Sequence, residues 1–215
     1  NAIGDTLPEH LCNLTDLVNL YIMRNNFIGG IPDSIGNLSS LEEFYADHNN
    51  FNDTIPHQIG NLASLRELRL NNNNFSGAIP ASLGDLSGLT DLDLSSNAFS
   101  GSIPPEMGRL VSLNTLDLSS NQLTGSIPDS LANLYSVSTL NLADNQLTGA
   151  IPAALGNFNT IAQLVLSYNQ LTGPIPASLG NVSIQTLQLN DNQLTGSIPS
   201  ELGNITNLLY MFLQN

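Results

Sequence analysis

Apolar residues recur along this chain in a pattern that neither a long helix nor a long strand explains. In residues 113–134, LNTLDLSSNQLTGSIPDSLANL, Leu116 and Leu118 alternate with polar neighbours, which predicts a short strand with one buried face. Gly125 and Pro128 follow, and they force the chain to turn. A segment this short cannot enclose a hydrophobic core, so it must bury its apolar face against copies of itself.

Copies of this segment fill the chain. An Ile-Pro step, or Leu-Pro in the first copy, marks the same point in each, and successive steps are 24 residues apart seven times and then 23 residues apart. The residue missing from the last interval lies near Asn181 to Ile184, on the turn before a predicted strand, where a deletion disturbs little. A fixed period of this length predicts a solenoid, in which the repeats stack as successive rungs. The prolines are Pro8, Pro32, Pro56, Pro80, Pro104, Pro128, Pro152, Pro176 and Pro199.

The repeated motif, LxxLxLxxNxLxGxIPxxLGxL, resembles the plant-type extracellular leucine-rich repeat found in receptor-kinase ectodomains and polygalacturonase inhibitors. The resemblance covers nearly the whole chain. It implies a leucine-rich repeat solenoid, α/β by family but mostly β-strands and 3₁₀ turns, wound as a right-handed superhelix with a parallel β-sheet on its concave face. It also implies a second short strand in each rung. It identifies a scaffold and not a ligand.

We expect residues 1–215 to form one array of about nine rungs, all of 24 residues except one of 23. Asn1 stands at the asparagine of a repeat, and Asn215 ends the chain one position short of the next. The flanking cysteine pairs typical of the family are absent. We therefore expect both ends to lie within a repeat, uncapped, with further domains of a longer protein beyond them.

Two inward rows run through successive rungs. Four phenylalanines, Phe27, Phe51, Phe75 and Phe99, predict a stacked spine in the core. The second row is an asparagine ladder, whose amides satisfy backbone groups left bare where each strand turns away. Its role is structural, and we expect no catalytic or metal-binding function from it. The ladder is Asn25, Asn49, Asn73, Asn97, Asn121, Asn145, Asn169 and Asn192.

Small residues mark two further positions of the repeat. The glycine of the LxG turn, such as Gly125, is expected to need positive φ. Asp5 and Asp53 hold that position in two rungs, and Asp tolerates such φ values better than most residues. The lone Cys12 stands where other repeats have Gly, which favours a small buried thiol. The alternative is a disulfide to chain outside this sequence.

Four basic residues stand against 18 acidic ones, a net charge of -14. This balance argues against nucleic acid or an anionic membrane as a partner. No apolar run is long enough for membrane insertion within this segment. His10, His48 and His57 are scattered, no His, Cys and acidic residues share metal-ligand spacing, and no serine has a base beside it. We expect no enzyme activity and no cofactor.

Ligand binding is expected at outward strand positions, which line the concave face. Three of the four arginines and most of the tyrosines lie there, and Tyr and Arg are enriched in binding hot spots. Six residues fall on three successive rungs and so predict one patch: Tyr21, Arg24, Tyr45, His48, Arg66 and Arg69. The alternative is a decorated surface in which Arg69 pairs laterally with Asp93. The candidate ligand-binding residues are Tyr21, Arg24, Tyr45, Asp47, His48, Arg66, Arg69 and Asp93.

Acidic residues gather beside this patch, at Glu67, Asp91, Asp93 and Asp117. Adjacent like charges are unfavourable unless a cation or an arginine sits among them. A calcium site is one explanation, but calcium needs six or more oxygens and no ligand loop of defined spacing is present. We predict no metal.

Six Asn-x-Ser/Thr sequons are compatible with a glycosylated extracellular chain, although the repeat motif itself generates some of them. These candidate N-glycosylation sites are Asn13, Asn37, Asn52, Asn74, Asn181 and Asn204.

Together these features favour a non-catalytic recognition module, extracellular or on the cell surface, receptor-like or inhibitor-like, that binds a protein, peptide or glycan on its concave face. Two alternatives stay open. The monotonous polar face from Asn114 to Asn190 also suits a structural, adhesion or wall-associated scaffold. A regular threonine row in the LTG turns, expected to repeat at strand spacing, suits ice or a carbohydrate surface. This row is Thr124, Thr148, Thr172 and Thr195.

Overall fold

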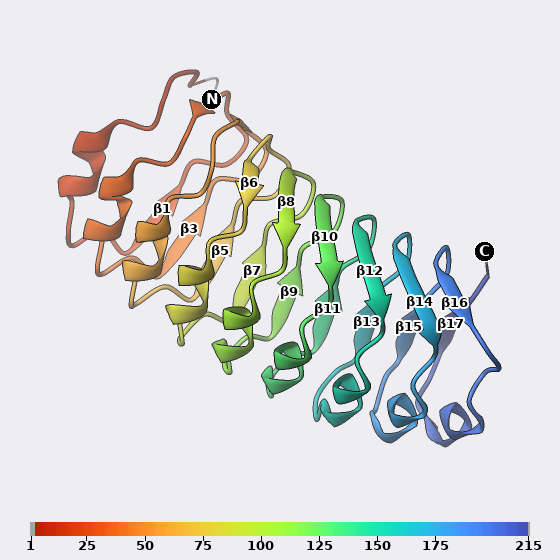
Figure 1. Cartoon of the computed structure of the whole chain (residues 1–215). Coiled ribbons are helices and arrows are strands. Elements are labelled where there is room, and N and C mark those ends of the chain that lie inside the picture. Colours follow the sequence, from red (N-terminus) through yellow and green to blue (C-terminus); the bar gives the residue numbers. More distant parts are fainter. Residues whose placement is uncertain (1–2, 215) are drawn as a thin grey trace.

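The computed structural model describes residues 3–214. Each rung contributes one strand to a nine-stranded parallel sheet, whose strands lie in sequence order (Figure 1). Equivalent residues pair across this sheet, as Leu92 does with Leu116. The strands are β1 (Asn19–Tyr21), β3 (Glu43–Tyr45), β5 (Glu67–Arg69), β7 (Asp91–Asp93), β9 (Thr115–Asp117), β11 (Thr139–Asn141), β13 (Gln163–Val165), β15 (Thr186–Gln188) and β17 (Tyr210–Phe212).

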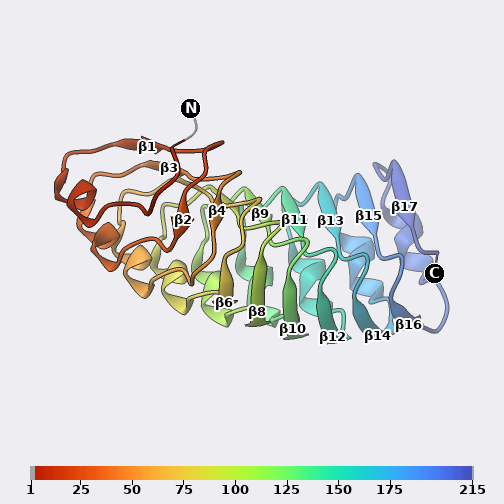
Figure 2. The same ribbon diagram turned by 90° about the horizontal axis from the view of Figure 1, so that it is seen from above.

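A second strand follows each of the first eight of these strands and lies on the other side of the core (Figure 2). Six of these strands form one parallel sheet and the first two form a separate pair. The pair is β2 (Ile28–Gly29) with β4 (Asn50–Phe51). The larger sheet contains β6 (Ser76–Ala78), β8 (Ala98–Ser102), β10 (Gln122–Ser126), β12 (Gln146–Ala150), β14 (Gln170–Pro174) and β16 (Gln193–Thr195).

A 3₁₀ helix follows each repeat proline and runs along a third side of the solenoid (Figure 1). No α-helix occurs within residues 3–214. The expected leucine-rich repeat solenoid, with its parallel sheet on the concave side, is therefore confirmed. The helices are η1 (Glu9–Asn13), η2 (Asp33–Asn37), η3 (His57–Asn61), η4 (Ala81–Asp85), η5 (Pro105–Arg109), η6 (Asp129–Asn133), η7 (Ala153–Asn157), η8 (Ala177–Asn181) and η9 (Ser200–Asn204).

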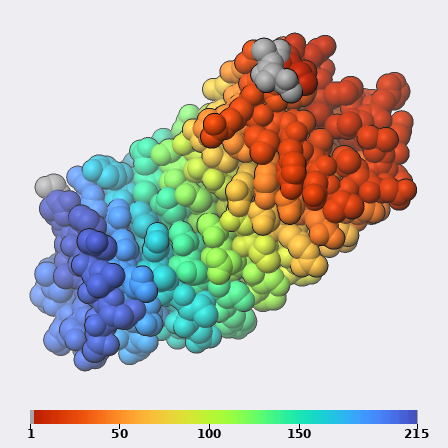
Figure 3. All heavy atoms as spheres, turned by 180° about the vertical axis from the view of Figure 1, so that it is seen from behind, coloured from red at the N-terminus to blue at the C-terminus, as the bar shows by residue number. Residues whose placement is uncertain are grey.

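The core is a continuous column of apolar side chains between the two sets of strands. Leu116 and Leu118, one rung's strand leucines, are both fully buried. The predicted phenylalanine spine is confirmed: the centroids of successive rings from Phe27 to Phe99 lie 5.8, 5.3 and 6.1 Å apart, and the rings are nearly parallel. Each rung covers the apolar edge of the one before it, and the rungs follow one another as bands along the elongated body (Figure 3).

The second strands pair in a displaced register. Thr124 lies opposite Gln146, and Ser126 lies opposite Thr148, so each strand is shifted by two residues relative to the repeat. Equivalent threonines are consequently not neighbours across the sheet. The prediction that the threonine row repeats at strand spacing is wrong, because this register and not the sequence period sets the pairing.

The turn glycines adopt positive φ as predicted, with values between 73° and 83°. Asp5 and Asp53 do not adopt it, so that part of the prediction is wrong. Instead, Oδ1 of each aspartate accepts a hydrogen bond from the backbone N–H of the next residue. The donors are Thr6 for Asp5, at 2.7 Å, and Thr54 for Asp53, at 2.8 Å. The second strand just before Asp53, β4, has only two residues, and the second-strand sheet is interrupted between β4 and β6.

The 3₁₀ helices pack closely through the glycine of the LG step. A Cβ built on Gly84 would lie 2.3 Å from the carbonyl oxygen of Glu106 in the next rung. Cys12 and Ala132 occupy the same repeat position with a side chain. Cys12 is a free thiol with no exposed surface, which confirms the prediction of a buried cysteine.

Candidate ligand-binding face

Three predicted residues form one aligned row on the concave sheet. The sheet register places Tyr21 beside Tyr45, and Tyr45 beside Arg69. The two tyrosine rings stack with their centroids 4.8 Å apart, and Cζ of Arg69 lies 4.8 Å from the centroid of the Tyr45 ring. An arginine at this distance over an aromatic face gains a cation–π attraction. Strand alternation points all three side chains away from the core, so they form the centre of the candidate site.

Carboxylates of the next rung hold this row in place. The Tyr21 hydroxyl donates a hydrogen bond to Glu43, and the Tyr45 hydroxyl donates to Oε2 of Glu67 at 2.5 Å. Nη2 of Arg69 donates to the same Glu67 oxygen at 2.9 Å. Glu67 therefore joins Tyr45 to Arg69, and neither Glu43 nor Glu67 was among the predicted ligand-binding residues. The available sequence signal is a tyrosine followed 22 residues later by a glutamate, in two successive rungs.

Both tyrosines are held in the neutral form. Its hydrogen bond to Glu43 raises the pKa of Tyr21. Burial raises the pKa of Tyr45, and the hydrogen bond to Glu67 raises it further. In each case the neighbouring carboxylate also disfavours a second negative charge on the phenol.

The alternative interpretation paired Arg69 with Asp93, but the structure does not contain this pair. Its Nε donates to Oδ1 of Asp91 at 3.3 Å. Oδ1 of Asp93 instead accepts hydrogen bonds from the backbone N–H of Ser95 at 3.0 Å and from its hydroxyl at 2.6 Å. Oδ1 of Asp93 is thus engaged within its own rung.

The remaining predicted residues lie around the row and not within it. Arg24 and His48 were expected on strands. They lie instead on the turns that follow β1 and β3, with φ of 54° and 53°. Nδ1 of His48 lies 2.9 Å from the Asp47 carboxylate. Arg66 precedes β5, and its Nε lies 3.9 Å from Glu42, an exposed pair that contributes little stability. Within residues 3–214, Arg24 has no acidic side chain within ion-pair distance.

A shallow polar hollow of about 250 Å³ lies beside Arg69. Burial raises the pKa of both Asp91 and Asp93, although Arg69 and Ser95 respectively lower it. Across residues 3–214, no three His, Cys, Asp or Glu side chains are arranged to hold a metal ion. The lining residues are Asp47, Arg69, Asn71, Asp91, Asp93, Thr115 and Asp117.

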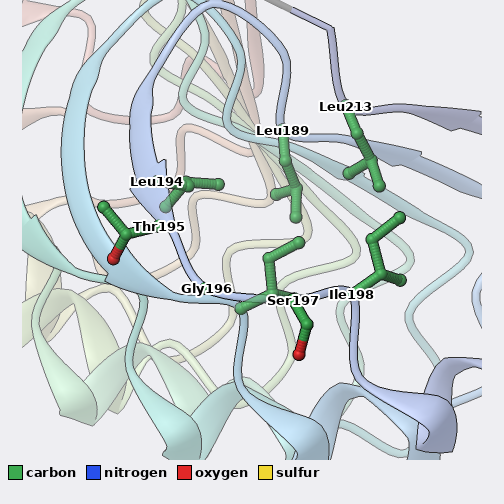
Figure 4. Close-up of a pocket in the computed structure, with 8 residues that line it drawn as sticks. Leu189, Leu194, Thr195, Gly196, Ser197, Ile198 and Leu213 are labelled. Atoms are coloured by element: carbon green, nitrogen blue, oxygen red, sulfur yellow. The ribbon is translucent and has the colours of Figure 1, made fainter.

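A second, mostly apolar hollow lies between the last rungs (Figure 4). Its volume is about 190 Å³, and Leu189, Leu194 and Leu213 project into it. Leu189 is buried, and the other two pack partly buried against the core cluster. This hollow extends the hydrophobic core, and the side-chain hydroxyls in its lining are those of Thr195 and Ser197.

All six sequon asparagines are exposed. Asn13, Asn37, Asn181 and Asn204 each end a 3₁₀ helix, whereas Asn52 and Asn74 lie next to the second strands. Their side chains are therefore accessible to modification and lie off the strands of the concave sheet. Their glycosylation stays a prediction. Within residues 3–214 no helix has the length and apolar character that crossing a bilayer requires.

The repeated rungs, buried leucine rows and parallel sheets define the class of protein: a leucine-rich repeat solenoid. Models of the leucine-rich repeat match residues 63–123 and 111–171, and further single-repeat matches cover 16–38, 40–62 and 183–205. The chain belongs to the leucine-rich repeat family, and its repeats are of the plant type. A comparison with curated proteins gives no match.

Solved structures similar to this chain include plant receptor ectodomains. A TDR receptor is 34% identical over 100% of this chain, with a TM-score of 0.97. The plant peptide hormone receptor RGFR1, solved in complex with RGF2, is 33% identical over 100% of the chain, with a TM-score of 0.90. The ectodomain of the Arabidopsis receptor kinase HAESA, solved with an IDA peptide hormone, is 36% identical over 93% of the chain, with a TM-score of 0.88. The chain spans only 37%, 38% and 33% of these three proteins.

Proposed function

We propose that this chain is a non-catalytic ligand-binding segment of an extracellular or cell-surface receptor-like protein, and that it binds a peptide or an extended protein segment on its concave face. The observation that carries this proposal is the row Tyr21, Tyr45 and Arg69. A stacked aromatic pair with an arginine offers a large contact area whose side chains are already ordered, so binding loses little conformational entropy. The similarity to receptors solved with peptide hormones supports a peptide over a glycan.

The structural or adhesion scaffold is the second candidate. From β9 to β15 the outward strand residues are mostly Thr, Asn and Gln, with Asp117 as the one charged member, and such a surface has few anchors for a specific ligand. The two functions make opposite predictions for the Tyr45 row. A scaffold tolerates its removal, whereas a receptor segment does not.

A peptide-display selection on the intact chain, followed by affinity measurements, tests the proposal. Tyr45→Ala and Arg69→Ala are each expected to weaken the selected peptide by about 30-fold, the effect of a hot-spot residue. Gln163→Ala and Gln188→Ala are matched controls on the same sheet, and they are expected to leave affinity within about twofold. Equal losses for both pairs, or no selectable peptide, would contradict the proposal. A ligand found only on a glycan array would move the ligand class to carbohydrate.

A further inference from the structure

The hydrogen bonds of the Tyr45 row change what it offers to a ligand. Each tyrosine hydroxyl has one hydrogen, and both hydrogens are donated to carboxylates of this chain. Arg69 is likewise held by Glu67 and Asp91, at 2.9 and 3.3 Å. Tyrosine and arginine side chains carry hydrogen-bond donors that could bind acceptors on a ligand. In this row most of those donors already bond to carboxylates of the chain.

The row leaves free the exposed surface of the Tyr21 ring and several carboxylate oxygens, because Tyr45 is covered by Tyr21 and Arg69. Tyr21 is 49% exposed. Oδ2 of Asp91 and Oδ2 of Asp93 accept no hydrogen bond from any residue in the range 3–214. Four carboxylates, those of Asp47, Asp91, Asp93 and Asp117, line the hollow together with one guanidinium, that of Arg69, so the balance of charge is negative.

Arg69 also shows how a guanidinium fits this surface. It lies against the Tyr45 ring while its nitrogens contact two carboxylates, which is the combination that favours a bound cation. A second cation placed beside Asp91 and Asp93 would meet two half-buried oxygens without partners. Without such a cation, burial disfavours the charged form of both carboxylates and raises their pKa values.

We propose that the segment bound over the Tyr45 row is basic, with a lysine or arginine side chain that enters the hollow and pairs with Asp91 and Asp93. This inference rests on the proposed function and specifies its ligand. A cation paired with these carboxylates also requires them ionised, so affinity falls as the pH falls through their pKa values.

Three synthetic peptides of one sequence, differing only in Arg, Gln or Glu at two neighbouring positions, are suitable probes. Fluorescence anisotropy on the intact chain is expected to show binding of the Arg peptide and at least about tenfold weaker binding of the other two. The double variant Asp91→Asn/Asp93→Asn is expected to weaken the Arg peptide by about tenfold or more. Both changes keep the side-chain shape, and circular dichroism checks that the fold is retained.

The matched control is Asp33→Asn/Asp129→Asn, which changes the net charge equally but on exposed residues of η2 and η6. It is expected to leave affinity within about twofold. Equal weakening by both double variants would mean that the overall charge attracts the peptide, and the proposal would be wrong. Equal or tighter binding of the Gln or Glu peptide would also overturn it. A neutral or acidic peptide whose affinity depends on Tyr45 and Arg69 would leave the proposed function standing and remove only this inference.

Discussion

The Oδ1 atom of Asn145 accepts a hydrogen bond from the backbone N–H of Leu123, one rung earlier, at 3.0 Å. The Nδ2 atom of the same amide donates to the carbonyl of Leu118 at 3.0 Å and to that of Leu142 at 3.2 Å. One side chain thus bonds to its own turn and to the preceding rung. Every asparagine from Asn49 to Asn192 in the ladder repeats this arrangement, so the row connects each rung to the one before it.

Asn145→Ala is expected to lower the free energy of unfolding by about 1–3 kcal/mol, because the N–H of Leu123 and several carbonyls lose a partner that buried surroundings cannot replace. Urea denaturation followed by circular dichroism measures this. Asn159→Ala, at an exposed position, is the control and is expected to change stability by less than about 0.5 kcal/mol. Equal effects of the two substitutions would show that the ladder contributes nothing specific.

Gly84→Ala is expected to destabilise the chain by about 1–3 kcal/mol, because its Cβ would overlap the backbone of the next rung, 2.3 Å from the Glu106 oxygen. Gly203 occupies the same repeat position in η9, where an added Cβ meets nothing within 4 Å. Gly203→Ala should therefore be nearly neutral. Thermal unfolding of the two variants compares them directly, and similar melting temperatures would contradict the packing argument.

Tyr168→Asn is expected to raise stability by up to about 1 kcal/mol. Tyr168 has a φ of 55°, a left-handed conformation that costs most residues about that much and that asparagine tolerates. Its side chain is 59% exposed, so little packing is lost. Asp144→Asn, at the same turn position, replaces one tolerant residue by another and should be nearly neutral. A decrease in the urea midpoint of Tyr168→Asn would indicate a packing role for the ring.

Asp93→Asn is expected to stabilise the chain at neutral pH. Burial raises the pKa of the Asp93 carboxyl, with Asp117 and Asp91 adding to the shift, while hydrogen bonds from Ser95 oppose it. Because the folded pKa exceeds that of the unfolded chain, the folded state binds the proton first as the pH falls. The stability contribution of this group is therefore present below its ordinary value of 3.8 and is lost as the pH rises through the raised value.

Urea midpoints measured across this acidic window test the effect. The Asn variant should lose the part of the pH dependence that Asp93 contributes, whereas Asp33→Asn, on an exposed site of η2, should retain it. If Asp93→Asn leaves the pH dependence unchanged, or lowers stability at neutral pH, burial is not the dominant influence on this carboxyl.

The period of the prolines and leucines was enough to predict the stacked rungs, the buried rows and the phenylalanine spine. These features depend on a pattern that recurs within every two dozen residues, and the hydrophobic effect acts on that pattern in each rung alike. The candidate site was partly predictable for the same reason. Tyr21, Tyr45 and Arg69 share one strand position, so stacking the rungs necessarily aligns them.

Partner choice was not predictable from the period. Arg69 bonds to Asp91 and Glu67 although Asp93 is its register neighbour, because Asp93 is bonded to Ser95. Arg24 and His48 shared the predicted patch, yet the left-handed turn after each strand moves them off it. In the second-strand sheet Thr124 faces Gln146, since that sheet is shifted by two residues.

The amino-acid sequence by itself therefore determined the solenoid and its core, because each rung repeats the same burial pattern and is stable only against its neighbours. The tertiary structure alone decided which hydrogen bonds the concave side chains form. Some of those bonds join residues about one rung apart, as from Tyr45 to Glu67, and others join residues two positions apart, as from Arg69 to Glu67. Side-chain directions and backbone turns that no local pattern encodes decide between the two kinds.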